Sequence, residues 1–257
     1  MVDGKRRPKR RRVEPADGMP FQKDSHWDSA VGQPALVVGN SPAVSLLRSE
    51  IEGLSGKAIR IGVNRILRTV EVDVVLTVDT SVIEVEKDRY GKFGGSFLFW
   101  DGLLKRAGVG KTTARYTAYT FTLAGNRNEK TFKIPRNPGE AYLRIGVTPA
   151  YAIQHALVVG CNPIGLVGVD FNAGEMAKNG ASHCFGQGKD ERATGGGKLR
   201  EHVKRFFVQF ADRAKERGVD VFNLSPYDAS PFNKVGWPRI TIQEFEALIQ
   251  RKKVVSE

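Results

Sequence analysis

The chain has 257 residues, of which 40% are hydrophobic and 26% are charged, and its net charge is +12. It contains no apolar run of the roughly 18 residues needed to cross a membrane, and no apolar stretch follows its basic start, so we expect neither a membrane span nor a secretory signal. Two distant cysteines, Cys161 and Cys184, argue against a disulfide scaffold or a thiolate metal site and suit a reducing cytoplasm.

A nearly pure basic block close to the start of the chain contributes much of the positive charge. Its cationic residues are Lys5, Arg6, Arg7, Lys9, Arg10, Arg11 and Arg12. Such a block cannot pack into a core, so we expect residues 1–30 to form a disordered basic arm and residues 31–257 to form a single domain. The block is typical of nucleic-acid binding through counterion release, and a solubilising tail explains it equally well.

Short apolar runs that end in polar residues predict the strands of a parallel sheet. The expected strands are 35–38, 58–63, 72–78, 96–100, 164–170 and 219–224. The expected helices are 43–54, one that begins with Thr148 as N-cap, 199–217 and 242–252. We interpret 85–145 as strands and insertions around the core sheet. The predicted fold class is α/β, with a Rossmann-like open, mostly parallel sheet and helices on both faces.

The first strand ends in the turn Gly39-Asn40-Ser41, which is the central candidate for a nucleotide site. Glycine lets a ligand approach the backbone closely, and an asparagine amide both donates and accepts hydrogen bonds. The N–H groups at the start of the next helix favour a phosphate. A plain strand–helix turn with an Asx cap explains the same residues.

Four further polar residues are expected at the same edge of the sheet, because they end other strands or begin a helix. They are Asn64, Asp79, Thr148 and Asp170. In an open α/β sheet, ligands bind outside the carboxyl ends of the strands. The repetition therefore supports a nucleotide site more strongly than the first turn does by itself.

These pieces, in this order, resemble the bacterial sialyltransferases of the Campylobacter lipooligosaccharide type, together with the related motility-accessory-factor and 6-hydroxymethylpterin pyrophosphokinase-like proteins. The matching pieces are Gly39-Asn-Ser-Pro42, Gly62-Val-Asn-Arg65, Gly168-Val-Asp-Phe171 and Phe222-Asn-Leu-Ser-Pro226. Two of the turns depart from the family pattern. Ser41 replaces a glycine, Ala43 replaces a serine, and Thr148-Pro-Ala150 stands where the family has Thr-Ser-Gly, without its phosphate-contacting serine.

The resemblance implies a metal-independent glycosyltransferase that uses a nucleotide-activated sugar. Asn40 and Asn64 would hold the nucleotide, Thr148 a phosphate, and His183 would be the general base. Tyr151 and Tyr227 are nearby candidates for donating a hydrogen bond to a phosphate. The acceptor would be a surface glycan or, given the basic arm, a nucleic acid, as when a phage decorates hydroxylated DNA bases.

Two alternatives remain open at this point. Asp79 and Asp170 could bind Mg²⁺, which would favour a pterin-type pyrophosphokinase that uses ATP. Helix capping or turn stabilisation explains these carboxylates as well. We rank capping above metal binding for Asp170 and give the two roles equal weight for Asp79. The second alternative is a non-enzymatic module that binds nucleotide or nucleic acid.

Overall fold

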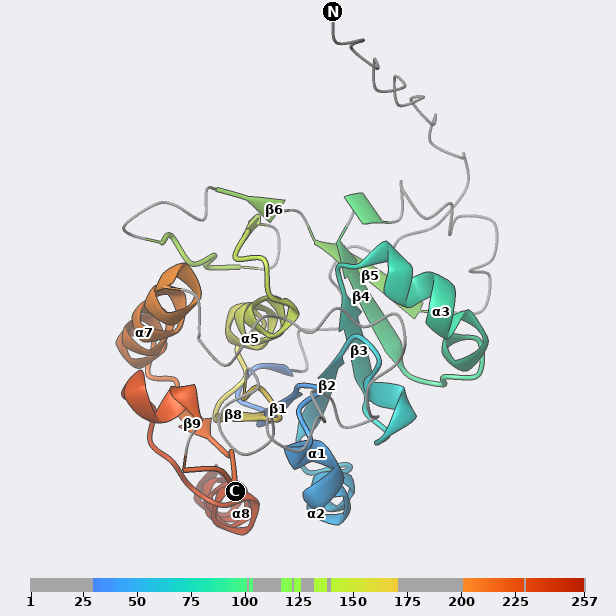
Figure 1. The fold of residues 1–257 in the computed structure, drawn as a ribbon. Helices are drawn as coiled ribbons and strands as arrows, with labels where there is room; N and C mark the ends of the chain where they lie inside the picture. The colour runs from blue at the N-terminus through green and yellow to red at the C-terminus, as the bar shows by residue number, and fades with distance from the viewer. Residues whose placement is uncertain are drawn as a thin grey trace, which may run out of the picture.

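The structure, a computed structural model, describes residues 30–256 apart from 101, 104–116, 122, 126–131, 138–139, 171–200 and 229. Its centre is a seven-stranded, all-parallel sheet with the order β5-β4-β3-β2-β1-β8-β9 (Figure 1). The strands are β1 (Ala35–Val38), β2 (Ile59–Val63), β3 (Val74–Thr77), β4 (Ser96–Trp100), β5 (Thr117–Phe121), β8 (Ile164–Val167) and β9 (Val221–Asn223). A small separate ladder pairs β6 (Leu123–Ala124) with β7 (Tyr142–Leu143).

Helices cover both faces of the sheet, which gives three layers (Figure 1). One face packs against α5 (Thr148–Val158) and α7 (Glu201–Glu216). The other face packs against α1 (Ala43–Leu46), α2 (Arg48–Gly53), α3 (Thr80–Tyr90) and α8 (Ile242–Ser256). Alternate residues of β1 point to the two faces, since Val37 belongs to the first core cluster and Val38 to the second. The predicted Rossmann-like α/β fold is confirmed.

Helix α5 is an interior element, because every residue in it except Pro149 is buried. The sheet covers one side of it, and the segment around β7 covers another. Gln154 fixes that segment, since its Oε1 accepts from the Leu143 N–H at 2.9 Å and its Nε2 donates to the Ala150 carbonyl at 3.0 Å. His155 is buried and has a structural role, since its Nδ1 forms a 2.7 Å hydrogen bond with the Tyr142 hydroxyl.

The strand order reverses direction between β1 and β8. The chain runs outward from β1 through β2, β3 and β4 to β5, and then returns through α5 to place β8 on the other side of β1. The carboxyl ends of β1 and β8 therefore form the topological switch point of the sheet. This switch point is where open α/β sheets bind their ligands.

Three local predictions need correction. The helix expected at 43–54 is broken at Leu47, whose φ of −107° and ψ of 21° are not helical. Val147, not Thr148, occupies the N-cap of α5, so Thr148 is the first helical residue. The segment 85–145, interpreted as strands and insertions, does contain the strands β4 to β7, but it begins with the end of α3, which extends to Tyr90.

Two other expectations have different outcomes. The basic arm lies outside the described residues, so its predicted disorder stays a prediction. No helix within the described ranges is both long enough and apolar enough to span a membrane.

Candidate functional site at the carboxyl edge of β1 and β8

The site begins with a close backbone approach between the turns that follow β1 and β8. The Gly39 N–H donates to the Val167 carbonyl and the Ser41 N–H to the Gly168 carbonyl, both at 2.8 Å. A Cβ at Gly39 would lie 2.1 Å from the Gly168 carbonyl oxygen, and Gly168 itself has a φ of +70°. Only glycine fits at Gly39 because a side chain would overlap with the neighbouring backbone.

Asp170 ties this turn to the loop after β9. One carboxylate oxygen accepts from the Ser41 hydroxyl and the other from the Ser225 hydroxyl, each at 2.5 Å. Asp170 is only 1% exposed. Two charge-assisted hydrogen bonds thus offset the cost of burying the carboxylate and fix three loops relative to one another.

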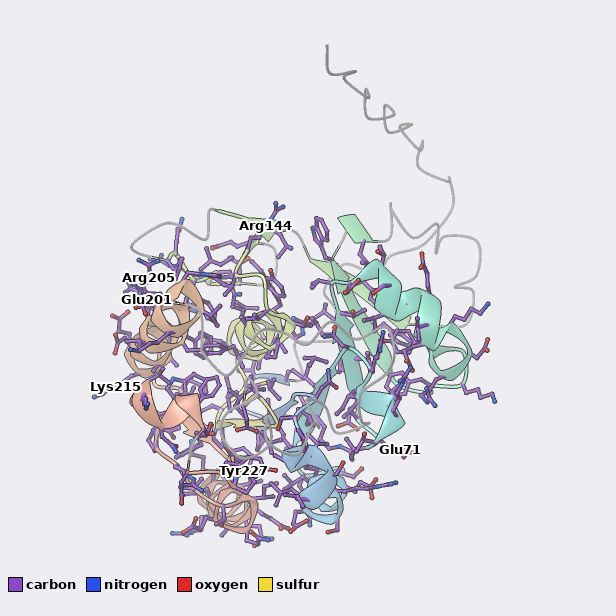
Figure 2. The ribbon with its side chains drawn as sticks, viewed as in Figure 1. Glu71, Arg144, Glu201, Arg205, Lys215 and Tyr227 are labelled. Carbon is purple, nitrogen blue, oxygen red and sulfur yellow. The ribbon has the colours of Figure 1, made fainter. Side chains whose placement is uncertain are left out.

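Tyr227, which is labelled in Figure 2, is near enough to Asp170 for the charge of this carboxylate to act on its phenol. Burial raises the pKa of its phenol, and the negative charge of Asp170 raises it further. The Tyr227 hydroxyl is therefore a protonated hydrogen-bond donor at neutral pH. Arg239 holds the same loop in place, because its guanidinium donates to the Ser225 and Pro226 carbonyls at 3.0 and 2.8 Å.

Asn40 presents an unsatisfied acceptor at the switch point. Its Oδ1 is buried, and no hydrogen-bond partner for it exists among the described residues. The great majority of buried polar side-chain atoms in proteins have a hydrogen-bond partner, so a buried oxygen without one is unusual.

Asn64 follows β2 at the position that corresponds to Asn40, because the register pairs Val38 with Gly62. Its backbone is left-handed, with a φ of 51°, a conformation that asparagine tolerates better than most residues. The Thr77 hydroxyl donates to Asn64 Oδ1 at 3.0 Å, and the Tyr90 hydroxyl donates to the Asn64 carbonyl at 2.8 Å. The side chain is thus oriented from β3, and its amide nitrogen remains the group able to donate.

Thr148 lies at the same edge of the sheet. Helix α5 leads into β8 and so runs antiparallel to it, which places the start of α5 beside the carboxyl ends of the strands. Thr148 is mostly buried, and no side chain caps this helix start. The positive end of the α5 dipole therefore lies at the carboxyl edge of the sheet.

The turn after β1 corrects one detail of the sequence interpretation. The Ser41 N–H is bonded to Gly168, the Ala43 N–H approaches the Ser41 hydroxyl at 3.3 Å, and the Val44 N–H donates to the Ser41 carbonyl. Pro42 has no N–H to offer. The N–H groups of Ser41, Ala43 and Val44 are already used, so they are not available for the phosphate that the start of this helix was expected to favour.

Asp79 caps a helix, which is one of the two roles that the sequence leaves open for it, the other being metal binding. Its Oδ1 accepts from both the N–H and the hydroxyl of Ser81 at 2.9 Å, at the start of α3. Among the described residues, the Asp170 carboxylate accepts hydrogen bonds from the two serines. The residues that directly follow it, 171–200, lie outside the described ranges, so helix capping by Asp170 stays a prediction. Within the described ranges, no group of three or more His, Cys, Asp or Glu side chains is placed to hold a metal ion.

Two parts of the predicted site cannot be placed, because His183 and the cationic residues between Lys5 and Arg12 lie outside the described residues. Conversely, sequence reasoning did not assign Ser225 and Thr77 to the site. Both sit at the carboxyl ends of predicted strands, as Asn64 and Asp170 do, and that position was the available signal. Their hydroxyls orient site residues and have no motif of their own.

No protein-family model matches this chain, and no curated protein matches it significantly. The function has to be inferred from the geometry of the switch point and from the sequence resemblance.

Proposed function

We propose that this protein is a glycosyltransferase that binds a nucleotide-activated sugar at the switch point between β1 and β8. The main support is the buried Oδ1 of Asn40, which lacks a partner among the described residues. Leaving a buried acceptor unpaired costs about 1–3 kcal/mol. A ribose hydroxyl or a base amino group at this position would donate to Oδ1 and recover that energy.

Asn64 complements Asn40 in this proposal. Thr77 occupies Oδ1 of Asn64 at 3.0 Å, which turns the amide nitrogen into the group that meets the ligand. One asparagine then accepts from the nucleotide and the other donates to it. Such a pair suits a base or a ribose, both of which carry donors and acceptors close together.

The phosphates of the donor would bind at the start of α5. The helix dipole and Thr148 favour negative charge there, and the protonated hydroxyl of Tyr227 is a further donor. His183 remains the proposed general base for the acceptor hydroxyl, by resemblance alone. None of these roles requires a metal ion, and the acceptor would be a glycan or a nucleic acid.

The proposal is tested by measuring nucleotide binding to the purified chain by thermal shift and calorimetry. The ligands are CMP-, UDP- and GDP-sugars, the free nucleotides, and ATP with and without Mg²⁺. We expect one class of nucleotide sugar to stabilise the protein in the presence of EDTA. Asn40→Ala should weaken its binding by about fivefold to tenfold, because one hydrogen bond in the complex is lost.

Gln33→Ala is the matched control, because it removes an exposed amide just before the opposite end of the same strand. It should leave nucleotide binding unchanged. Stabilisation by ATP that disappears in EDTA would instead indicate the pyrophosphokinase. If a nucleotide sugar binds, no transfer to any acceptor is detected and His183→Ala changes no binding constant, the non-enzymatic alternative is correct.

A further inference from the structure

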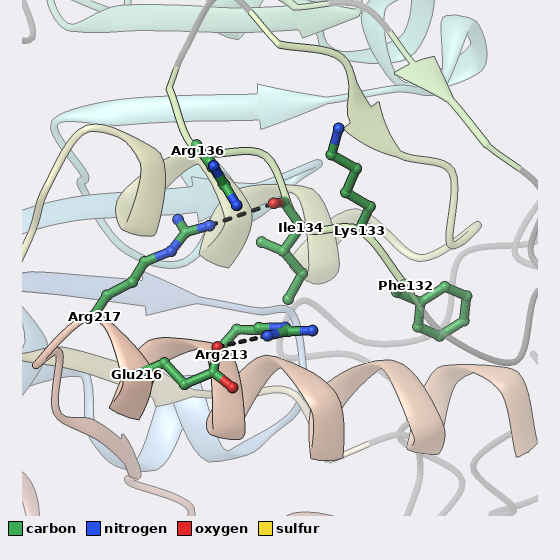
Figure 3. Close-up of a pocket in the computed structure, with 7 residues that line it drawn as sticks. All are labelled: Phe132, Lys133, Ile134, Arg136, Arg213, Glu216 and Arg217. Carbon is green, nitrogen blue, oxygen red and sulfur yellow. Dashed lines mark hydrogen bonds and ion pairs between the residues drawn. The ribbon is translucent and has the colours of Figure 1, made fainter.

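A second candidate site lies away from the switch point of β1 and β8, between the segment Phe132–Arg136 and the last turn of α7 (Figure 3). Helix α7 leads into β9, so its last turn lies at the amino edge of the sheet, opposite to Asn40. The cavity has a volume of about 390 Å³. This is large enough for a ligand group, and none of its lining residues belongs to the site described above.

The side chains around this cavity are predominantly cationic. The lining residues are Phe132, Lys133, Ile134, Arg136, Arg213, Glu216 and Arg217. Four of the seven are positively charged and one is negatively charged. We call this set the basic pocket.

The only ion pair within the basic pocket is that between Arg213 and Glu216, at 2.6 Å, as far as the described part of the chain shows. Arg217 donates to the Ile134 carbonyl at 3.3 Å, and it forms no ion pair at contact distance with a described carboxylate. Lys133 and Arg136 are exposed, and no described carboxylate lies within ion-pair distance of either. The cations therefore outnumber the counter-charges that the protein itself supplies.

The local scaffold holds these cations close together. Burial lowers the pKa of Arg217, and the nearby charges of Arg136 and Arg213 lower it further, while the carboxylates of Glu140 and Glu216 offset only part of this shift. The nearest additional carboxylate, Glu140, is engaged with the backbone N–H of Arg136 at 3.2 Å and with the Asn137 amide at 3.1 Å. The negative end of the α7 dipole favours the cations but supplies only a partial charge. A bound anion would relieve the remaining repulsion.

The chemistry of the basic pocket suits a phosphate group. Guanidinium groups offer paired N–H donors that match phosphate oxygens, and lysine adds a point charge. The aromatic ring in the pocket wall is not available for base stacking, because Phe132 is 1% exposed and Arg205 lies 5.7 Å above its ring. The contact would thus be to the backbone of a nucleic acid and would not depend on the base sequence.

We propose that the basic pocket binds the phosphodiester backbone of a nucleic acid. A nucleic acid is favoured over a free phosphate because the whole chain is strongly basic, with a net charge of +12, and carries a second cationic block at Lys5–Arg12. The inference does not depend on the identity of the nucleotide donor, since it concerns a different site.

The test uses the full-length chain and a short fluorescein-labelled DNA duplex, with binding measured by fluorescence anisotropy at several salt concentrations. The Lys133→Gln/Arg136→Gln variant should bind about tenfold more weakly, because two charged contacts are lost. Its plot of log K against log salt should be less steep by about 2, since each neutralised phosphate contributes about 0.9 to the slope. Both side chains are exposed, so the melting temperature should stay the same.

A matched control removes the same charge elsewhere. Lys87 on α3 and Lys234 in the 3₁₀ turn η4 (Pro231–Lys234) are exposed lysines outside the basic pocket, and Lys87→Gln/Lys234→Gln should change neither quantity by as much. Equal losses in the two variants would overturn the proposal, as would a wild-type chain that does not bind DNA. Should the double variant unfold, the single Lys133→Gln change has to show about half of the change in slope.

Inorganic phosphate provides the last arm of the experiment. If millimolar phosphate stabilises the wild-type chain but not the double variant, while DNA binding is the same for both, the basic pocket takes free phosphate and the nucleic-acid proposal is wrong. Loss of DNA binding in the double variant alone supports it.

Discussion

Replacing Gly39 by alanine tests the close approach of β1 and β8 directly. The added methyl group would lie 2.1 Å from the Gly168 carbonyl oxygen, 2.6 Å from its carbon and 2.7 Å from a methyl group of Val169. Two of these three atoms belong to the backbone and cannot rotate away. The two turns would therefore have to separate by nearly an ångström.

The cost of this separation can be worked out from the contacts it disrupts. Overpacking a dense region costs about 1–3 kcal/mol. The hydrogen bonds from the Gly39 and Ser41 N–H groups to the β8 turn, both 2.8 Å long, would lengthen as well, and each contributes about 1 kcal/mol. We expect Gly39→Ala to lose about 3–5 kcal/mol of unfolding free energy, which corresponds to a drop of about 10 °C in melting temperature.

The assay is urea and thermal unfolding of Gly39→Ala beside Gly53→Ala. Gly53 lies at the end of α2, and no atom lies within 4 Å of a Cβ built there. The control should therefore be neutral or gain up to about 1 kcal/mol. If the melting temperature of Gly39→Ala is within about 2 °C of the wild-type value, the close approach of the two turns, on which the proposed site depends, is contradicted.

Two further predictions concern buried ionisable groups. Asp170→Asn should cost about 2–3 kcal/mol in urea unfolding, because charge-assisted bonds to Ser41 and Ser225 are replaced by neutral ones. The exposed Asp228, paired with Arg239, is its control, and Asp228→Asn should cost under about 1 kcal/mol; equal losses would contradict the role given to Asp170. Burial lowers the pKa of His155 from 6.5 to about 3, so the unfolded chain binds the extra proton and stability falls as the pH drops from 6.5 towards 3. The loss from this group is about 2 kcal/mol by about pH 5, and the stability difference between wild type and His155→Gln should shrink by that amount; a difference independent of pH would show that His155 is not buried as a neutral group.

The sheet was predictable from sequence because its strands are buried on both faces. Runs such as Ala35–Val38 and Ile164–Val167 are apolar throughout, and each is followed by a polar turn. Helix α3 was harder to predict, because its apolar residues Val82, Ile83 and Tyr90 are separated by charged ones, and Glu86 is buried among arginines. Packing of Glu86 against Arg68 and Arg89 is a tertiary effect that no local period reveals.

The site was predictable in its position and only partly in its contacts. Strand ends pointed to Asn40, Asn64 and Asp170, and the structure places the loops of these residues at one edge of the sheet. The bonds from Ser41 and Ser225 to Asp170 span 129 and 55 residues, so no sequence pattern could predict them. The backbone N–H groups after β1 seemed free because their partners in the β8 turn lie equally far along the chain.

The all-round burial of α5 has a consequence for the interpretation of natural variation. A helix with one solvent-facing side tolerates changes on that side, whereas α5 has almost no position where a substitution would be silent. Homologous chains should therefore change slowly throughout this helix, including at Gln154 and His155, which hold the core together and are not proposed to touch a ligand. Slow change in α5 would record packing, and even slow change at Thr148, which is buried at the start of the helix, would not by itself indicate chemistry.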